Sequence, residues 1–392
     1  MPTIDIKDML QHAYQNGYAV GAFDLVSLEF LEGIMEAAER CRSPVILSLA
    51  ESHFEHYNFE LLATAAETAA QQSTVPVAIF LDHGTGLDSA IRAINGGCNG
   101  VMVDASHHAL PDNIALTRQV VEMAHSCGVP VEGELGYVPG VEGEDAERHP
   151  GKICYTTVEE AREYLRQTGV DFLAVSIGTV HGRMKGQPEL DIERLEEINR
   201  ALRIPLVIHG GTGLSDAQFR KLVSNGVAKI NYYTALSDAA AQQILVNSRT
   251  GATKGYTQLT KGTIDAVRAE AERCMRLWGS AGQAEAVLQS CRPWQMIEHL
   301  IIYNVSGIDD QQAGQMAAEG RRILSQIPGV RHVLTGEAVK QDAKYRFCWL
   351  IRFVHERVIE SYRDHPEHLR FADQVFRPVA GDRISIDYKL VH

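Results

Sequence analysis

Eight short apolar runs, alternating with amphipathic segments, constrain the fold of this chain more than any other feature. A strand that is buried on both faces of a parallel sheet is an almost continuous apolar run of four to eight residues. Eight strand–helix units in succession predict a TIM (β/α)₈ barrel, because the alternative, a doubly wound sheet, seldom needs eight. The runs are Val20–Asp24, Pro44–Leu49, Val77–Asp82, Gly100–Ala105, Val129–Gly136, Phe172–Gly178, Pro205–Gly210 and Lys229–Thr234.

The pattern changes after the eighth run. Helices are expected to residue 284, with a polar, glycine- and threonine-rich interruption at Gly251–Thr260. Beyond Pro293 the order is strand, helix, strand, strand, helices, strand, which predicts a small ferredoxin-like α+β domain. The expected strands are Met296–Asn304, Arg331–Ala338, Tyr345–Phe353 and Ile384–Leu390, with helices at Gln311–Gln326, Arg357–Arg363 and His368–Arg377. We therefore predict two domains, 1–284 and 295–392.

Composition excludes several classes of partner. The formal net charge is −13, so no basic face is expected for nucleic acid. The apolar runs have the length of strands, far short of a membrane span, and no signal peptide is evident. The seven cysteines are odd in number and include no CxxC pair. They predict reduced thiols in a cytoplasmic protein and argue against both a disulfide framework and a thiolate zinc site.

Three histidines stand at the carboxyl ends of three predicted strands. His83 follows the third run, His181 follows the sixth and His209 lies near the end of the seventh. TIM-barrel enzymes place their chemistry at this mouth, and each histidine precedes a glycine that permits close approach of a ligand. One such histidine alone is as easily a hydrogen-bonded wall residue. Three imidazoles with a fourth position open are typical of catalytic zinc, so we predict a metal triad.

Glycine-rich and polar turns follow the last two strands. The seventh run ends in Gly210-Gly211-Thr212-Gly213, and the eighth ends in Asn231-Tyr232-Tyr233-Thr234. Backbone amides and helix N-termini at these two places form the usual phosphate site of a barrel. A glycine turn after a strand is a weak signal alone, but its position beside His209 favours phosphate binding near the metal.

Acidic residues complete the predicted mouth. Asp82 directly precedes His83, and a carboxylate there either orients a histidine or exchanges a proton with substrate. The acidic loop Gly136–Glu147 is long enough to close as a lid, although a solvated surface loop is the alternative. The pair His107-His108 has the residues of a metal site but lies in a polar loop before Pro111, so we expect it to be solvated.

Six separated motifs resemble those of the class II, metal-dependent ketose-bisphosphate aldolases. They are LDHG from residue 81, MVDAS from 102, VEGELG from 131, GTVHG from 178, IHGGTGL from 208 and KINYYT from 229. The resemblance covers about residues 2–284. It implies that His83, His181 and His209 bind one catalytic Zn²⁺ and that Asp82 gives a proton to the aldehyde oxygen. Implied phosphate contacts come from Gly182, Gly210, Gly211, Thr212, Asn231, Tyr232, Tyr233 and Thr234.

The resemblance also implies roles for three further carboxylates. Asp104 and Glu134 match positions that hold an alternative or second cation in some members of the family. Glu142 matches a carboxylate on a mobile loop that removes or returns the proton on the nucleophilic carbon, and Glu144 is its rival in that alignment. Departures limit what carries over: Tyr233 replaces a small or acidic residue, Asp24 replaces an asparagine, and Ala50 replaces a serine. Such contacts set specificity, so the acceptor aldehyde stays open.

The reaction itself favours a metal. Cleaving a carbon–carbon bond beside a ketone leaves an enediolate, whose charge needs either a Lewis-acid metal or a lysine Schiff base. No lysine lies within the sixth or seventh run; Lys185 lies beyond the sixth, and Lys229 starts the eighth. We therefore expect reversible aldol cleavage of a phosphorylated ketose to dihydroxyacetone phosphate, or a close analogue, and an aldehyde. The alternatives are a related metal-dependent lyase or isomerase acting on an unusual deoxy or acidic sugar phosphate, and a non-catalytic aldolase-like scaffold.

The tail resembles the stress-responsive Dabb family of dimeric α+β barrels. The match rests on Met296–His299, Ile327–Val330, Tyr362–His368 and the closing strand. It implies oligomerisation, as a homodimer or homotetramer, or a small ligand pocket. For His365 and His368 we favour a fold-supporting or capping role over catalysis.

Overall fold

The computed structural model of the chain describes residues 3–141, 143–146, 153–183, 188–249 and 255–390. Eight parallel strands pair in sequence order and close into a barrel, because β8 also pairs with β1. The strands are β1 (Val20–Asp24), β2 (Val45–Ala50), β3 (Val77–Gly84), β4 (Gly100–Val103), β5 (Val131–Leu135), β6 (Phe172–Val175), β7 (Leu206–Ile208) and β8 (Val227–Tyr232). The predicted TIM barrel is confirmed.

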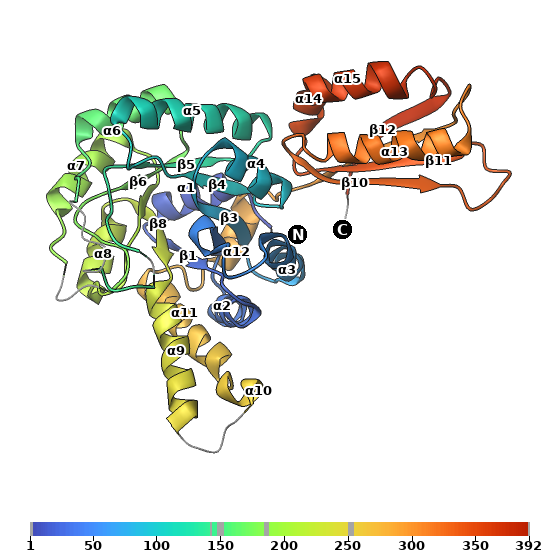
Figure 1. Cartoon of the computed structure of the whole chain (residues 1–392). Helices are drawn as coiled ribbons and strands as arrows, with labels where there is room; N and C mark the ends of the chain where they lie inside the picture. The colour runs from blue at the N-terminus through green and yellow to red at the C-terminus, as the bar shows by residue number, and fades with distance from the viewer. Residues whose placement is uncertain (1–2, 142, 147–152, 184–187, 250–254, 391–392) are drawn as a thin grey trace.

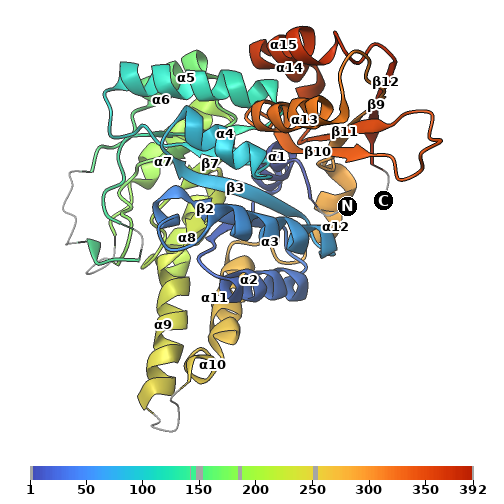
Figure 2. The same cartoon turned by 45° about the vertical axis from the view of Figure 1, so that its right-hand side comes forward.

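Helices surround the barrel (Figures 1 and 2). The structure places them at α1 (Ile6–Asn16), α2 (Leu28–Cys41), α3 (Phe59–Gln72), α4 (Leu87–Asn95), α5 (Leu110–Ser126), α6 (Val158–Thr168), α7 (Ile192–Leu202), α8 (Asp216–Ser224), α9 (Thr234–Arg249), α10 (Tyr256–Leu259), α11 (Thr263–Leu277) and α12 (Ala284–Ser290), with a 3₁₀ turn η1 (Glu51–His53). Ser215 is the N-cap of α8, and its side chain forms a capping box with Gln218. In both views α9 and α11 run side by side away from the barrel body.

Side chains of the barrel strands alternate between two separate cores. Phe23, Leu47 and Leu81 pack outward against the helices, whereas Ala22 and Phe80 belong to a core inside the barrel. Because side chains alternate along a strand, the inward set continues towards the carboxyl ends. There it becomes polar, with Asp24, Ser48, Asp82, Glu132, Glu134 and Asn231 all buried. The barrel is therefore apolar at its amino end and polar at its mouth.

Two helices close the amino end of the barrel. Ile6, Met9 and Leu10 of α1 join the inner core, and so does Val287 of α12. The sequence left residues 285–294 between the two predicted domains, but α12 packs there as part of the barrel. These apolar side chains therefore close the amino end of the barrel, opposite the polar mouth.

The tail is a four-stranded antiparallel sheet with helices on one face (Figure 1). The strand order is β10-β11-β9-β12, which confirms the predicted α+β fold. Its elements are β9 (Ile297–Tyr303), α13 (Asp310–Leu324), β10 (Val330–Glu337), β11 (Phe347–Phe353), α14 (Val358–Arg363), α15 (Pro366–Phe371), a π-helical turn η3 (Ala372–Phe376) and β12 (Arg383–Lys389). On the opposite face Leu334, Leu350 and Ile386 are exposed.

The tail contacts the barrel at α4, beside β10 (Figure 2). Asn95, the last residue of α4, accepts a hydrogen bond of 2.8 Å from the Gly329 amide and donates to the Ile327 carbonyl at 3.1 Å. Arg331 forms a 2.8 Å ion pair with Glu67 of α3. Since α4 leads into the amino end of β4, the tail lies away from the mouth. Within the described residues, no helix combines the length and apolarity needed to cross a membrane.

Candidate active site

The end of β3 turns so that two neighbouring residues both face the mouth. His83 adopts a left-handed conformation, with φ 48°, which is uncommon for a residue other than glycine. The β3–β4 register also shifts between Leu81 and Gly84. On a regular strand Asp82 and His83 would point to opposite faces. Strained backbone of this kind is concentrated at functional sites, because the surrounding structure must hold it in place.

The three predicted metal ligands converge at this mouth. One ring nitrogen of each of His83, His181 and His209 lies within 4.8 Å of the others. Tetrahedral zinc places its ligand atoms about 3.4 Å apart, given Zn–N bonds of about 2.05 Å. Small side-chain movements would therefore complete the coordination.

Each imidazole is oriented by an acceptor on its other nitrogen. His83 Nδ1 lies 2.7 Å from Asp104 Oδ2, and His181 Nδ1 lies 3.1 Å from the Val138 carbonyl oxygen. His209 Nε2 lies 3.0 Å from Glu132 Oε1. An acceptor must receive the N–H, so the nitrogens left for a metal ion are Nε2 of His83, Nε2 of His181 and Nδ1 of His209. Outer partners of this type fix the tautomer of metal-binding histidines.

The charges in the site place a proton where a metal ion would bind. Burial by itself lowers the pKa of His83. The charge of Asp82 and the hydrogen bond to Asp104 outweigh burial and raise that pKa well above its usual value. Burial and the charge of His83 lower the pKa of His209 well below its usual value. His83 Nε2 and His209 Nδ1 lie 2.9 Å apart, close enough for one proton to be shared between them. A metal ion between these two nitrogens would replace that proton.

A second group of possible ligands shares His83. His83, Asp104 and Glu134 also bring one ligand atom each within 4.8 Å of one another. Burial, reinforced by the charge of Asp104, raises the pKa of Glu134 well above its usual value. The site therefore favours a proton on Glu134 when no cation is near. This arrangement suits the predicted second cation, although zinc and a second ion would compete for His83.

Two buried residues to which the sequence analysis assigned no role, Glu132 and Lys229, lie under the triad. Glu132 accepts from His209, and its other oxygen lies 2.8 Å from Lys229 Nζ. Lys229 donates to Asn231, which donates to Asp82. The alternation of β5 could have revealed Glu132, because Glu132 and Glu134 stand two residues apart and share one face. The register shift between β7 and β8 hides Lys229, since it interrupts the alternation near residue 228.

The predicted phosphate-binding residues fall into two groups. Gly182, Gly210 and Gly211 are buried beside the triad, and Asn231 is buried at the end of β8. Gly210 has φ 68°, and a Cβ there would clash with the Val180 carbonyl, so glycine is required. Thr212, partly buried, follows in the loop to α8. Backbone amides at these places suit an anion.

The side chain of Tyr232 points away from the mouth. Its ring packs against Trp278 at 5.4 Å between barrel and helices, and its hydroxyl donates to Glu270 at 2.8 Å. Tyr232 could therefore reach a ligand in the mouth through its backbone only. Tyr233 is turned the other way and packs on His53, with ring centroids 4.5 Å apart. The sequence motif did not separate these two neighbours.

The loop predicted as a lid lies against the triad. The His181 amide donates to the Pro139 carbonyl at 2.8 Å, and the Gly143 amide donates to Thr234 Oγ1 at 3.0 Å. Arg183 donates to the Gly143 carbonyl at 2.7 Å and is also paired with Asp238 of α9. Glu142 lies outside the described residues. The described part of the loop thus contacts the backbone of the predicted metal ligand His181 and the start of α9.

Two of the residues that depart from the family motifs, Asp24 and Ala50, stand at the carboxyl ends of β1 and β2. Asp24 and Ala50 are both buried, and Ala50 pairs in register with Asp82. Burial and the carboxylates of Asp24 and Asp82 raise the pKa of Tyr57, which lies near this end of the barrel. The mouth therefore also carries carboxylates on the side of β1 and β2.

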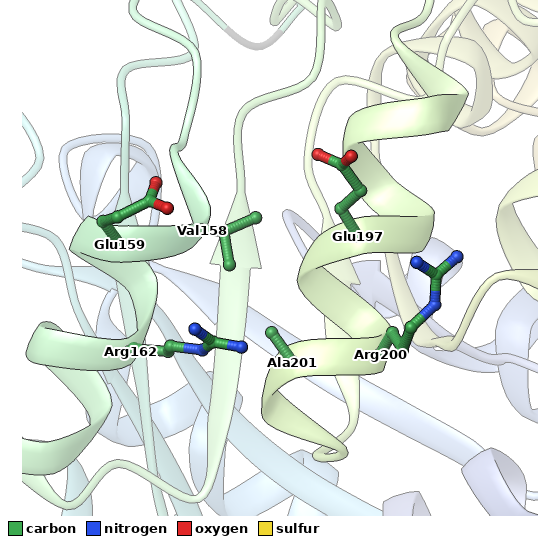
Figure 3. Close-up of a pocket in the computed structure, with 6 residues that line it drawn as sticks. All are labelled: Val158, Glu159, Arg162, Glu197, Arg200 and Ala201. Atoms are coloured by element: carbon green, nitrogen blue, oxygen red, sulfur yellow. The ribbon is translucent and has the colours of Figure 1, made fainter.

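The other histidines that the sequence analysis considered do not join the triad. His107 and His108 are exposed. In the tail, His365 caps α15 by accepting from the Glu367 amide, and His368 Nδ1 lies 3.0 Å from the Arg363 carbonyl oxygen, as a fold-supporting role requires. A groove lies between α6 and α7 on the outside of the barrel (Figure 3). Its volume is about 300 Å³. It is lined by Val158, Glu159, Arg162, Glu197, Arg200 and Ala201.

Comparison with known families assigns both parts of the chain. Residues 4–283 match the family described as fructose-bisphosphate aldolase class-II. Residues 297–390 match the stress responsive A/B barrel domain. Both expected resemblances are thereby confirmed.

Individual relatives agree with the first match. A probable fructose-bisphosphate aldolase of Bacillus subtilis is 41% identical over 247 residues, which cover 62% of this chain and 86% of that protein. A fructose-bisphosphate aldolase of Staphylococcus aureus is 40% identical, covering 62% and 85%. Among solved structures, the YdjI aldolase of Escherichia coli K12 is 33% identical with a TM-score of 0.63, covering 72% of this chain and 99% of that one.

Proposed function

The chain belongs to the class II fructose-bisphosphate aldolase family, and from this premise we propose that it is a metal-dependent enzyme cleaving a phosphorylated ketose reversibly. The observation that carries the proposal is the orientation of the three imidazoles. His83, His181 and His209 each hold one nitrogen against an acceptor and turn the other towards a common point. Three nitrogen ligands with a position left for substrate form a catalytic, rather than a structural, zinc site.

The charge of the mouth supports a divalent cation. Among the described residues of the inward set, Asp24, Asp82, Asp104, Glu132 and Glu134 are acidic, whereas Lys229 is the one lysine or arginine. Buried carboxylates are costly without compensating charge, so this excess suits one Zn²⁺ and a second cation near Asp104 and Glu134. When bound, zinc would polarise the ketone as a Lewis acid and offset the charge that develops as the carbon–carbon bond breaks.

The residues of the chain divide the remaining work. Asp82 would take the proton from the hydroxyl on the aldehyde side during cleavage and return it during condensation. Its acidity fits this role: burial favours the neutral acid, but the charges of His83, His209 and Lys229 lower the pKa of Asp82. Gly182, Gly210 to Thr212 and Asn231 to Thr234 would hold the phosphate of the donor half, Tyr232 through its backbone.

We assign the proton transfer on the nucleophilic carbon to the loop carboxylate Glu142, with Glu144 as its rival. The neighbouring residues support a loop that acts at the mouth. Gly143 contacts Thr234 and Arg183, and the carbonyl of Glu144 accepts from the Arg183 amide at 2.7 Å. These backbone contacts support a role for this segment beside the predicted metal ligand His181.

The donor half is assigned more narrowly than the acceptor half. The phosphate loops favour dihydroxyacetone phosphate or a close analogue as the donor. On the acceptor side, Tyr233 packs against His53, and Asp24 adds a buried carboxylate. These two residues favour an uncharged, hydroxylated aldehyde, because a carboxylate there repels an acidic one. The departures at Tyr233 and Ala50 motivate the second candidate, a lyase or isomerase for an unusual deoxy or acidic sugar phosphate.

Proton exchange on dihydroxyacetone phosphate tests the proposal. The purified protein is expected to contain about one zinc per chain and to exchange one carbon-bound proton of the ketone with solvent, with loss of exchange after chelation and recovery with Zn²⁺. Condensation with a panel of aldehydes then identifies the acceptor, and unequal rates are expected. Undiminished exchange by metal-free protein would refute the aldolase assignment. Equal condensation rates with all aldehydes would refute a role of Tyr233 in selecting the acceptor.

We further propose that the tail joins copies of the chain into a homo-oligomer. The matched domain is described as a barrel, whereas this sheet is open and has four strands. A row of apolar residues crosses all four strands on the face without helices, since Leu334, Leu350, Leu300 and Ile386 are aligned in register. A second copy of the sheet would cover this row and complete a barrel. The proposed domains are then a barrel, predicted as residues 1–284 and extended by α12, and a tail of residues 295–392.

Charge on this face should break the assembly. The double variant Leu350→Lys, Ile386→Lys is expected to lower the sedimenting mass of the full chain, because two ammonium groups would oppose each other across the interface. Leu61→Lys is a matched control, since Leu61 is an exposed leucine of α3 on the barrel. An unchanged mass of the double variant would contradict an interface on the sheet.

A further inference from the structure

Lys229 lies inside the barrel, directly below the groups proposed for catalysis. Its side chain is 0% exposed, as is that of Glu132, to which it is paired at 2.8 Å. The ammonium nitrogen also stands 4.2 Å from the centre of the Phe80 ring, which belongs to the apolar inner core. The lysine therefore marks the boundary between the apolar floor and the polar mouth. A buried ammonium is costly unless several partners compensate it.

One arm of contacts leads from Lys229 towards Asp82. Lys229 Nζ donates to Asn231 Oδ1 at 2.6 Å, and Asn231 Nδ2 donates to Asp82 Oδ1 at 2.7 Å. An ammonium group has three donors and no acceptor, so the oxygen of the Asn231 amide must face it. The NH₂ of Asn231 is thereby turned to Asp82. This hydrogen bond holds Oδ1 of Asp82 in place. It thereby also fixes the orientation of the other carboxylate oxygen, Oδ2.

The second arm leads towards the metal triad. Glu132 Oε2 faces Lys229, and Glu132 Oε1 lies 3.0 Å from His209 Nε2. A carboxylate that receives the ammonium on one oxygen still accepts on the other, so His209 carries its proton on Nε2. The ligand atom of His209 is then Nδ1, which faces His83 Nε2. The tautomer of a metal ligand thus depends on Glu132, which is held by Lys229.

We infer that Lys229 is a positioning residue for both halves of the proposed chemistry, an inference that rests on the proposed function. Because it only donates, it sets the direction of each hydrogen bond in the chain from Asp82 through Asn231 and Glu132 to His209. It orients the proton-transferring carboxylate and the third metal ligand together. Its place below both groups, with its nitrogen engaged by two partners, separates this role from that of a nucleophilic lysine.

The substitution Glu132→Gln gives a sharp test of hydrogen-bond direction. With Lys229 present, the oxygen of the introduced side-chain amide must face the ammonium, so the NH₂ of that amide must face His209 Nε2. His209 would then carry its proton on Nδ1 and lose its ligand atom. In metal-free protein, ¹⁵N shifts of the His209 ring are expected to report an Nε2–H tautomer for the native chain and an Nδ1–H tautomer for Glu132→Gln.

Removing the lysine as well should restore the His209 tautomer and zinc affinity, but it should not restore kcat. In Lys229→Met, Glu132→Gln the introduced amide is free to turn, so the Nε2–H tautomer and zinc affinity should largely return. Zinc affinity, measured by competition with a chelator, is expected to fall about 10–100-fold in Glu132→Gln and to recover most of that loss in the double variant. The kcat for cleavage should stay about 100-fold low in the double variant, because Asn231 no longer has a donor to orient it.

The control and the contrary outcomes separate positioning from charge balance. Arg331→Met removes an ion pair that is nearly as buried, at the contact of barrel and tail, and should change neither zinc affinity nor kcat. If Lys229 only neutralises Glu132, the uncharged double variant would regain full kcat, and the native tautomer would persist in Glu132→Gln; either result overturns the inference. A native protein without zinc or proton exchange would instead overturn the proposed function.

Discussion

His209→Ala is expected to reduce zinc content to a small fraction and to lower kcat for aldol cleavage about 1000-fold or more. His209 is 1% exposed and is one of the three predicted nitrogen ligands. Two ligands hold zinc weakly, and the loss of a Lewis acid costs several kcal/mol of transition-state stabilisation, about 1.4 kcal/mol for each tenfold in rate. Zinc per chain and kcat measured on the same preparation check both parts of the prediction.

His108→Ala is the matched control for this experiment. His108 is exposed in the loop after β4, and its substitution is expected to leave zinc and kcat unchanged. If His209→Ala instead kept one zinc per chain with kcat within about tenfold of the native value, the triad would not be the catalytic centre. Far-ultraviolet circular dichroism of both variants would show whether the barrel itself is intact.

The barrel could be predicted because its strands and its helices follow different apolar periods. Val20–Asp24 agrees with β1 residue for residue, whereas the sixth run was expected to reach Gly178 and β6 ends at Val175. The difference arises because apolar and glycine residues continue past the last ladder hydrogen bond, into the turn that leads to His181. Strand ends are therefore less certain than strand identities, and functional residues of a barrel lie at those ends.

The chemistry of the site could be predicted further than its supporting contacts. His83, His181 and His209 were found because TIM barrels gather strand ends at one mouth. Their orienting acceptors were not found, since one is the Val138 carbonyl and another, Glu132, lies on a strand where no role was assigned to it. Main-chain acceptors carry no sequence signal.

Local backbone geometry could not be predicted from the sequence either. The left-handed His83 lets both it and Asp82 face the mouth, and no pattern of residue types indicates a left-handed histidine. In the KINYYT motif, Tyr232 packs outward on Trp278 while Tyr233 packs on His53. Alternation could have separated these two tyrosines if the register shift before them had been evident. Inference from spacing is reliable where the strand is regular and fails at its bulges.

A different outcome is expected for Asp82→Asn, because Asp82 acts at the mouth without binding the metal. Its nearer oxygen lies 3.9 Å from His83 Nε2, so zinc content should be unchanged. The kcat for cleavage should fall about 100- to 10 000-fold, because an amide cannot take the hydroxyl proton. Proton exchange on dihydroxyacetone phosphate should persist, since we assign that transfer to the loop carboxylate rather than to Asp82.

The split between these two activities is what identifies the role of Asp82. Loss of cleavage together with exchange would make Asp82 necessary for both proton transfers, or for zinc binding if zinc fell too. Asp112→Asn is the control, because Asp112 is exposed in the first turn of α5 and its substitution should affect neither activity. In Asp82→Asn the retained side-chain oxygen can still accept from Asn231 across the 2.7 Å contact, so the substitution removes the charge and keeps the geometry. Exchange that survives while cleavage fails therefore assigns Asp82 to the aldehyde half of the reaction.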